Sequence, residues 1–453
     1  MAKMLSANQL IANSRTLFPI KLSLAIAFSF GIYLAILSLS NDEMNNGTSL
    51  IIAAFSGLIA ITLFYLILRK YFESSILKYA LLFFIIRLSL GVVHYLFFFE
   101  ADYFRQSSSD FSYLEEYMWL YDSMDMFAAG TAGTADADIV AGYAAENKNY
   151  EMIYLMSFLF YFGGVKALNV ATFNSLVTIY AAFLIYLISM KINDNQKNAI
   201  FCFLIVALQP FEMITSILSR DTFGQMLVFY SAFLLIYFFS SNSVLKLLTI
   251  VAAGWISSLV REVYFIIPLV VGAGSNLFYS FIYHFRSFRK SNIIIFIFVT
   301  ISFIALIPFF LDTVFGRFLN VDFVSKIFQL PVSFIYSMVG PFPWTQVLYQ
   351  VTGYEYHIPG YLTSVFNITI YLGLLVFLLN KRPSRMQFMI LFFFFLFYLA
   401  GIIVYGGKHT MYYSIAIPLL ALFDLNSRIF EFFSKFIMVF IFFLILNFVY
   451  LLR

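Results

Sequence analysis

Long apolar runs, each about 20 residues and so the length of a membrane-spanning helix, constrain this chain more than any other sequence feature. Of its 453 residues, 62% are hydrophobic and 11% are charged, whereas soluble domains have about 25% charged residues. This leaves too little polar surface to cover a water-soluble particle of this size. Because the runs are continuous, they predict helices rather than the alternating, roughly ten-residue strands of a β-barrel.

The sequence therefore predicts an all-α, polytopic integral membrane protein forming a single domain over residues 1–453, with about 12–14 transmembrane helices. The expected spans lie near residues 21–40, 49–68, 79–98, 168–190, 198–218, 222–240, 245–260, 263–283, 292–311, 360–379, 386–406, 411–424 and 433–451. The apolar piece 150–164 is marginal for a crossing at about 1.5 Å per residue. Whether it crosses the membrane is left open.

Lys and Arg concentrate in the short connections on one side of these spans, which the positive-inside rule assigns to the cytoplasm. The expected inner segments are the N-terminus, 69–78, 191–197, 286–290, 381–385 and 428–435. The opposite side then carries two large outer loops, 99–150 and 312–359. This orientation is consistent along the chain only when 150–164 does not cross alone.

The first outer loop, 99–150, is acidic and aromatic, and its basic residues are Arg105 and Lys148. Asp110 follows a serine run, so it either caps a helix beginning near residue 111 or serves as a base beside a lipid phosphate. No metal or other cofactor is required by the sequence. The loop nevertheless has the carboxylates with which a divalent cation could be held.

Charged pairs occur at two span ends. Arg220 has the fork geometry that suits a phosphate, while the alternatives are a salt-linked turn with Asp221 or an Asp221 cap on the next helix. Arg261 and Glu262 interrupt the apolar stretch 247–273. An ionisable pair in such a run is a candidate functional site, and the alternative is an arginine that snorkels at a span end.

Further candidates lie in other outer segments. Lys408 and His409 follow two glycines, so they form either a plain turn or a site where Lys408 meets a phosphate and His409 shuttles a proton. His357 lies near Glu355 and could form an acid–base pair with it. Trp344 is expected to anchor the second loop at the membrane interface or to contact the glycan.

Several chemistries are disfavoured by what the sequence lacks. It contains no Gly-rich phosphate loop, no His-Glu-x-x-His motif and a single cysteine, Cys202. A net charge of +4 does not indicate a nucleic-acid surface. A substrate already activated on a lipid therefore fits better than ATP or a nucleotide sugar.

Arg87 and His94 share one helix face, and we expect them to make structural contacts inside the bundle.

The layout of the whole chain resembles bacterial polysaccharide-assembly enzymes of the GT-C-like superfamily, and among them the O-antigen or capsule repeat-unit polymerases. The shared features are about a dozen helices, two prominent outer loops and outward-facing arginines. Asp110, the Asn-Tyr-Glu at 149–151 and the Arg220–Asp221 pair also resemble lipid-phosphosugar-dependent transferases. The chain has neither a double-Asp motif nor spaced arginine repeats in its two loops, so both families stay open.

The resemblance implies a multi-pass protein of the bacterial inner (cytoplasmic) membrane that joins undecaprenyl-diphosphate-linked oligosaccharide repeat units at its outer face. Asp110 or His409 would act as the base, with Glu262 in reserve. Arg220, Arg261 and Lys408 would neutralise the leaving diphosphate. The other residues expected to bind diphosphate or glycan are Asp221, Arg105, His357 and Trp344. The implied partners are the lipid-linked oligosaccharide, the bilayer, a chain-length regulator and a flippase.

Two alternatives are a polyprenyl-phosphosugar-dependent glycosyltransferase and a flippase for the same lipid-linked unit. Flippases usually have two similar halves, charges near mid-span and short outer loops. The long outer loops and span-end charges of this chain favour an enzyme. Ionisable groups gathered at one membrane face would support that choice, and a two-sided central cavity would oppose it.

Overall fold

The computed structural model describes residues 17–40, 44–94, 159–164, 166–208, 221–239, 243–259, 262–283, 383–405 and 421. Regular secondary structure in these residues is helical throughout, with no strand, as the apolar runs predict. Four helices in this part are long and apolar enough to cross a membrane. They cover Phe18–Leu37, Asn46–Tyr71, Ile76–Val93 and Leu168–Asn193.

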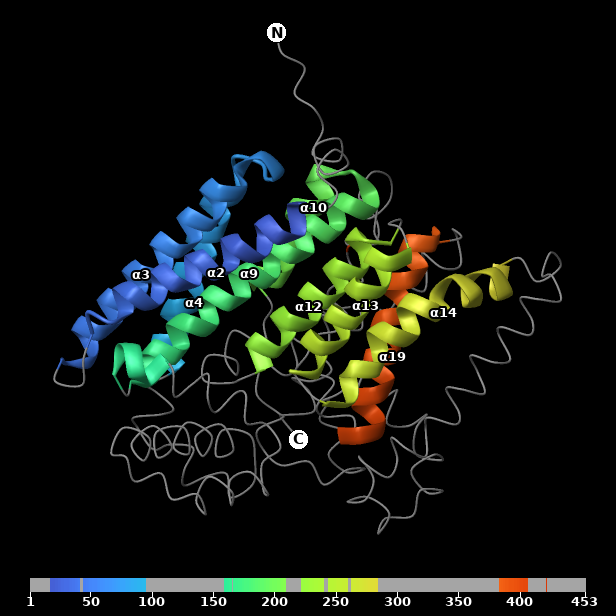
Figure 1. Cartoon of the computed structure of the whole chain (residues 1–453). Coiled ribbons are helices and arrows are strands. Elements are labelled where there is room, and N and C mark those ends of the chain that lie inside the picture. The colour runs from blue at the N-terminus through green and yellow to red at the C-terminus, as the bar shows by residue number, and fades with distance from the viewer. Residues whose placement is uncertain are drawn as a thin grey trace, which may run out of the picture.

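Figure 1 shows the described helices packed as one bundle, with the elements from early in the chain on one side and those from later on the other. In chain order they are α2 (Leu17–Leu37), α3 (Asn46–Leu68), the 3₁₀ turn η1 (Arg69–Tyr71), α4 (Ile76–His94), α9 (Ala167–Asn193), α10 (Gln196–Leu208), α12 (Asp221–Tyr237), α13 (Ser243–Ser258), the 3₁₀ turn η3 (Glu262–Phe265), α14 (Ile266–Tyr283) and α19 (Arg385–Tyr405).

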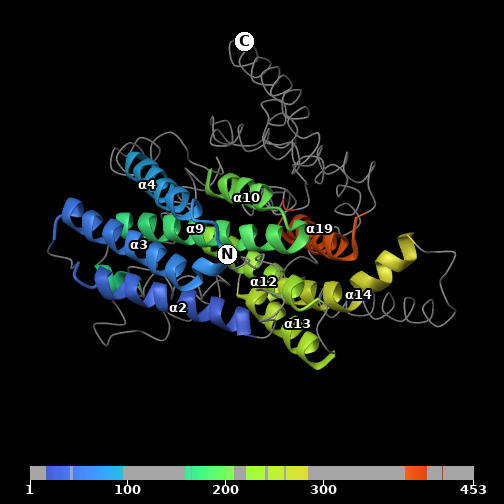
Figure 2. The ribbon, with the colours of Figure 1, turned by 90° about the horizontal axis from the view of Figure 1, so that it is seen from above.

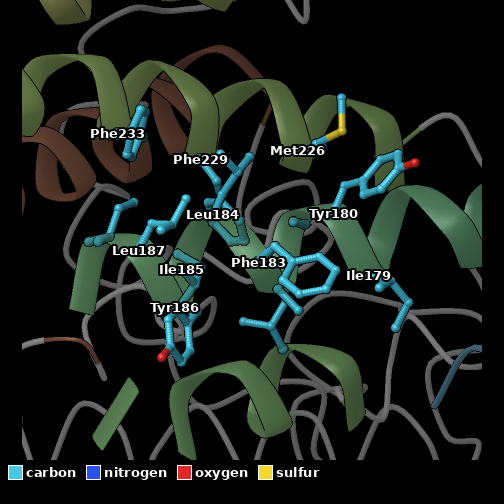
Figure 3. Close-up of a cluster of buried hydrophobic side chains, with 14 of the residues drawn as sticks. Ile179, Tyr180, Phe183, Leu184, Ile185, Tyr186, Leu187, Met226, Phe229 and Phe233 are labelled. Atoms are coloured by element: carbon cyan, nitrogen blue, oxygen red, sulfur yellow. The ribbon is translucent and has the colours of Figure 1, made fainter. Parts of the chain in front are cut away.

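Helix α9 is the centre of this bundle, and α3, α4, α10 and α12 all pack on it (Figure 2). In the membrane-length part of α9, 89% of the residues are buried, whereas the share is 28% in α2, so α2 lies at the periphery. Figure 3 shows the apolar packing around α9, where Phe229 of α12 lies beside Leu184. On another face of α9, the Phe183 ring is 5.2 Å from the Phe203 ring of α10.

Aromatic contacts fix the direction of α12 relative to α9. The Phe173 and Phe223 rings, near the start of each helix, have centroids 6.1 Å apart. Near the end of each helix, the Lys191 ammonium lies 5.8 Å from the centroid of the Tyr237 ring. Helices α9 and α12 are therefore parallel, as the predicted orientation requires.

Helix α2 runs antiparallel to α9 and α12. Its last part contacts the start of α9, where the Tyr33 hydroxyl donates to the Asn169 carbonyl at 3.4 Å. Its first part contacts the end of α12, where the rings of Phe18 and Tyr237 are 5.6 Å apart. At one end of the bundle, α2 and α4 finish and α3, α9 and α12 begin. We call this the loop end, and we call the opposite end the basic end.

Cationic residues gather at one of these two ends, where the acidic residues Glu73 and Asp194 also lie. Among the described residues, every Lys and Arg other than Arg87 and Lys166 lies at the basic end: Lys21, Arg69, Lys70, Lys78, Lys191, Lys197, Lys246 and Arg385. Asp221 and Glu262 begin α12 and η3 at the loop end. The spans thus place positive charge together on one side, as the Lys/Arg pattern predicts.

The apolar piece 150–164 is described only in its final residues. Residues 159–164 lie beside the start of α9, where the Asn169 side-chain amide donates to the Gly163 carbonyl at 2.6 Å. Helix α4 also finishes at this end. His94 and residue 159 therefore lie at the same end of the bundle.

Of the span predicted over 198–218, the structure describes α10, and residues 209–218 lie outside the described part. Helix α10 covers Gln196–Leu208, about 20 Å at 1.5 Å per residue, which is less than the roughly 30 Å of a bilayer core. Pro210 follows two residues later, and proline both lacks a backbone donor and disfavours helical geometry at the residue before it.

Candidate functional site

The predicted site residues fall mostly outside the described part of the chain. These are Arg105, Asp110, Arg220, Arg261, Trp344, His357, Lys408 and His409. Asp221 and Glu262 are described by their backbone: Asp221 is the first residue of α12, and Glu262 is the first residue of η3. Both stand at helix starts of the loop end, where the backbone N–H groups favour a carboxylate.

A buried hydrogen-bond network organises the loop end around Asn169, in the first turn of α9. The Asn169 Nδ2 donates to the Gly163 carbonyl at 2.6 Å, and Oδ1 accepts from the Ser49 hydroxyl at 3.2 Å. Ser49 Oγ is also 2.6 Å from Ser40 Oγ. Tyr33 also donates to the Asn169 carbonyl, so this set joins α2, α3, α9 and residues 159–164. We call Tyr33, Ser40, Ser49, Gly163 and Asn169 the Asn169 clasp.

Lys166 strengthens the same connection. It is the residue before α9 and is 9% exposed, and its ammonium donates to the Met44 carbonyl in the turn between α2 and α3. A buried ammonium requires such a partner, because moving it out of water is otherwise costly. The start of α9 is therefore held by hydrogen bonds from Lys166 to the Met44 carbonyl, from Asn169 to the Gly163 carbonyl and from Ser49 to the Asn169 side chain.

Two glycines allow the chain to approach the clasp closely. A Cβ at Gly163 would lie 2.7 Å from Asn169 Nδ2 and 2.8 Å from Leu37 Cγ, so a larger residue would displace the clasp. Gly164 has φ 74°, a left-handed conformation that costs glycine little, and its N–H donates to the Phe160 carbonyl at 2.9 Å. The sequence Gly-Gly at this point ends the short helical turn against α9.

Arg87 is the one described arginine inside the bundle. It is 2% exposed and its Nη1 donates to the Ala207 carbonyl at 3.2 Å. Ala207 lies in the last turn of α10, where carbonyls lack helical partners and the helix dipole favours a cation. This confirms the structural contact predicted for Arg87. The side chain of His94 is outside the described part.

Buried polar side chains continue along the first half of α9 and onto α12. Asn174, Thr222 and Gln225 are each at most 1% exposed. The 6.1 Å contact of the Phe173 and Phe223 rings brings the two helix starts together. The sequence analysis missed these residues, although an asparagine within an apolar run is a signal, because a polar side chain in a membrane helix needs a partner.

The described loop end provides a polar scaffold, and most of the predicted reactive residues lie outside the described part. It contains the donors Lys166 and Arg87. It also contains the starts of α9, α12 and η3, and the predicted acidic and basic site residues of the span ends are next to the starts of α12 and η3 in the sequence. Over the described ranges, no group of three or more His, Cys, Asp or Glu side chains could hold a metal ion. The carboxylates of the acidic loop lie outside these ranges.

Known proteins provide no family assignment for this arrangement of helices and polar side chains. No family model, no curated protein and no solved structure matches the chain.

Proposed function

We propose that the chain is a glycosyltransferase of the bacterial inner membrane that polymerises undecaprenyl-diphosphate-linked repeat units into O-antigen or capsule at the outer face. The observation that supports this best is the asymmetry of the bundle. Lysines and arginines gather at the basic end, while the Asn169 clasp, the buried Thr222 and Gln225, and the acidic starts of α12 and η3 occupy the loop end. An enzyme that works at one membrane face needs such a polarised end.

The proposed reaction is a glycosyl transfer between two lipid-linked glycans. A hydroxyl oxygen of the acceptor unit forms a bond to the anomeric carbon of the donor glycan, and the bond from that carbon to the diphosphate oxygen breaks. Asp110 or His409 takes the hydroxyl proton, with Glu262 as the alternative base. Undecaprenyl diphosphate leaves while cationic side chains neutralise its developing charge.

The candidate cations adjoin the loop end in sequence. Arg220 immediately precedes Asp221, the first residue of α12, and Arg261 immediately precedes Glu262, the first residue of η3. Helices α12, α13 and α14 pack against one another, so these two helix starts belong to one part of the bundle. A fork-shaped guanidinium is suited to a diphosphate because it can donate two parallel hydrogen bonds.

The same placement weighs against a flippase. A flippase needs ionisable groups in a central cavity that opens to both sides in turn. Among the described residues, Arg87 is the one charged group well inside the bundle, and it caps the end of α10. A transferase that adds one sugar from a polyprenyl phosphosugar would use the same face, so the product must distinguish it from the polymerase.

The polysaccharide profile of a strain that lacks this gene tests the proposal. We expect a single-repeat-unit band in place of the ladder. The wild-type chain should restore the ladder, and Arg261→Ala or Arg220→Ala should not. Arg385→Ala is the matched control, because it removes one exposed guanidinium from the opposite end of the bundle. Immunoblots of the membrane fraction must show equal amounts of all variants.

Other outcomes would assign the chain differently. A truncated repeat unit would identify the single-sugar transferase, because the unit itself would be incomplete. Loss of all surface repeat units, with lipid-linked units accumulating inside, would identify the flippase. An unchanged ladder would remove the chain from surface-polysaccharide assembly.

A further inference from the structure

The peripheral helices α2, α3 and α4 each carry a stripe of exposed apolar side chains. On α2, Ile20, Leu24 and Phe28 recur every four residues and are 57%, 64% and 55% exposed. A helix repeats every 3.6 residues, so these side chains line one face. The corresponding exposed residues on the other helices are Ile51, Phe55 and Leu66 of α3 and Leu82, Ile85 and Val93 of α4. These faces fit acyl chains rather than water.

Each of the three stripes ends in exposed cations at the basic end. Lys21 adjoins Ile20 at the start of α2, and Lys78 lies one helical turn before Leu82 on α4. Arg69 and Lys70 of η1 follow the stripe of α3. The long side chains of Lys and Arg can extend their charge to the headgroup level while their stems cover apolar surface.

A ring contact joins the two segments that carry Lys21 and Lys70. Phe18 of α2 and Tyr71 of η1 have ring centroids 4.1 Å apart; Phe18 lies three residues before Lys21, and Tyr71 directly follows Lys70. The nearest acidic residue in the described sequence of these helices is Glu73, and no other Asp or Glu occurs within residues 17–40 and 44–94. This surface therefore has a net positive charge directly beside an apolar face.

We propose that these helices bind anionic phospholipids of the surrounding membrane, with acyl chains along the stripes of α2, α3 and α4 and headgroup phosphates on the cations that end each stripe: Lys21 of α2, Arg69 and Lys70 of η1, and Lys78 of α4. A free phosphate would use the charges but leave the stripes uncovered, whereas a phospholipid uses both. Clusters of Lys and Arg at the cytoplasmic ends of membrane helices attract anionic headgroups in this way. The inference needs only that the bundle is embedded in a membrane, and it is independent of the proposed catalytic function.

The test measures phospholipid binding by the purified full-length chain in neutral detergent micelles, by native mass spectrometry or by the quenching of a fluorescent lipid. Phosphatidylglycerol and phosphatidylcholine with the same acyl chains are compared, and glycerol phosphate serves as the soluble headgroup. We expect tighter binding of phosphatidylglycerol than of phosphatidylcholine and no competition by glycerol phosphate. In the double variant Lys21→Gln/Lys78→Gln, we expect affinity for phosphatidylglycerol to fall by about fivefold for each lysine removed.

Matched variants separate a site from general electrostatics and from misfolding. Lys197→Gln removes an exposed lysine from the same end, on the shorter helix α10, and should leave the affinity within about twofold of wild type. Lys21→Arg/Lys78→Arg keeps both charges and should bind as wild type does. Equal affinity for the two lipids, an unaffected Lys21→Gln/Lys78→Gln variant, displacement by glycerol phosphate, or an equal loss in Lys197→Gln would each overturn the proposal.

Discussion

The Asn169 side chain joins α9 both to Gly163 and to Ser49 of α3, so its replacement should weaken the loop end. Asn169→Leu leaves the Gly163 carbonyl and the Ser49 hydroxyl without this partner inside the bundle. We expect the free energy of unfolding to fall by about 2 kcal/mol, the range for buried hydrogen-bonding groups left unmatched. Denaturant or heat unfolding of the purified chain in detergent gives this value.

Thr172→Val is the control for Asn169→Leu. The Thr172 hydroxyl donates to the Leu168 carbonyl of its own helix, so its loss breaks no contact between elements. We expect a cost of about 0.5 kcal/mol, the average for hydrogen bonds inside membrane bundles. Equal costs for the two substitutions would show that the clasp does not join the helices energetically.

Arg87 should matter through its contact with the end of α10. Arg87→Leu removes the donor to the Ala207 carbonyl, and Arg87→Lys keeps a cationic donor at the same position. We expect Arg87→Leu to be the less stable of the two by about 1–2 kcal/mol, because a carbonyl at a buried helix end is left without it. Hydrogen exchange should also become faster in the last turn of α10.

A different result would remove the capping role. If Arg87→Leu is as stable as Arg87→Lys and exchange in α10 is unchanged, the guanidinium does not stabilise this helix end. The burial of Arg87 would then need another explanation, such as a contact with bound substrate.

At the scale of the helices, close packing between α3 and α4 depends on Gly57. A Cβ at this position would overlap the Phe84 ring, which is fully buried and so cannot move away easily. Small residues at helix crossings allow such approach in membrane bundles. We expect Gly57→Ala to lower the free energy of unfolding by about 1–3 kcal/mol, the usual cost of overpacking.

Gly31 on α2 provides the matched control, because no atom lies within 4 Å of a Cβ built there. Gly31→Ala should be neutral or stabilise by up to about 1 kcal/mol, since alanine has the higher helix propensity. If the two alanine variants have the same stability, the α3–α4 crossing is looser than described here.

The helices were predictable from the sequence where apolar length decides the outcome. The span expected at 168–190 corresponds to α9, Ala167–Asn193, and the all-helical class holds over the described residues. Of the span expected at 198–218, the structure describes α10, Gln196–Leu208, while residues 209–218 lie outside the described part. Local patterns of hydropathy thus predict that a helix exists better than where it ends.

The loop-end network was not predictable in the same way. The Ser49 and Asn169 side chains are 120 residues apart in the sequence and meet only because α3 and α9 pack side by side. Nothing in the apolar pattern specifies that pairing. For the catalytic candidates Asp110 and Arg261 the sequence remains the basis of the assignment, since both lie outside the described residues.

For the whole molecule, the account requires that the basic end faces the cytoplasm. Cys202 is the single cysteine and is buried, so new cysteines can be placed in a Cys202→Ser background. Gly47→Cys at the loop end should react with an impermeant maleimide added to spheroplasts, and Ser74→Cys at the basic end should react only after the membrane is opened. Both positions are exposed. The reverse pattern would place the proposed site on the wrong face.

The measurement that tests the central claim most directly is polymerisation by the purified full-length chain in liposomes supplied with an undecaprenyl-diphosphate-linked repeat unit. The account predicts lipid-linked products of two or more units, with release of undecaprenyl diphosphate, and loss of both in Arg261→Ala but not in Arg385→Ala. If the folded wild-type chain leaves the authentic repeat unit unchanged while translocating it across the bilayer, the chain is a transporter and the account is wrong.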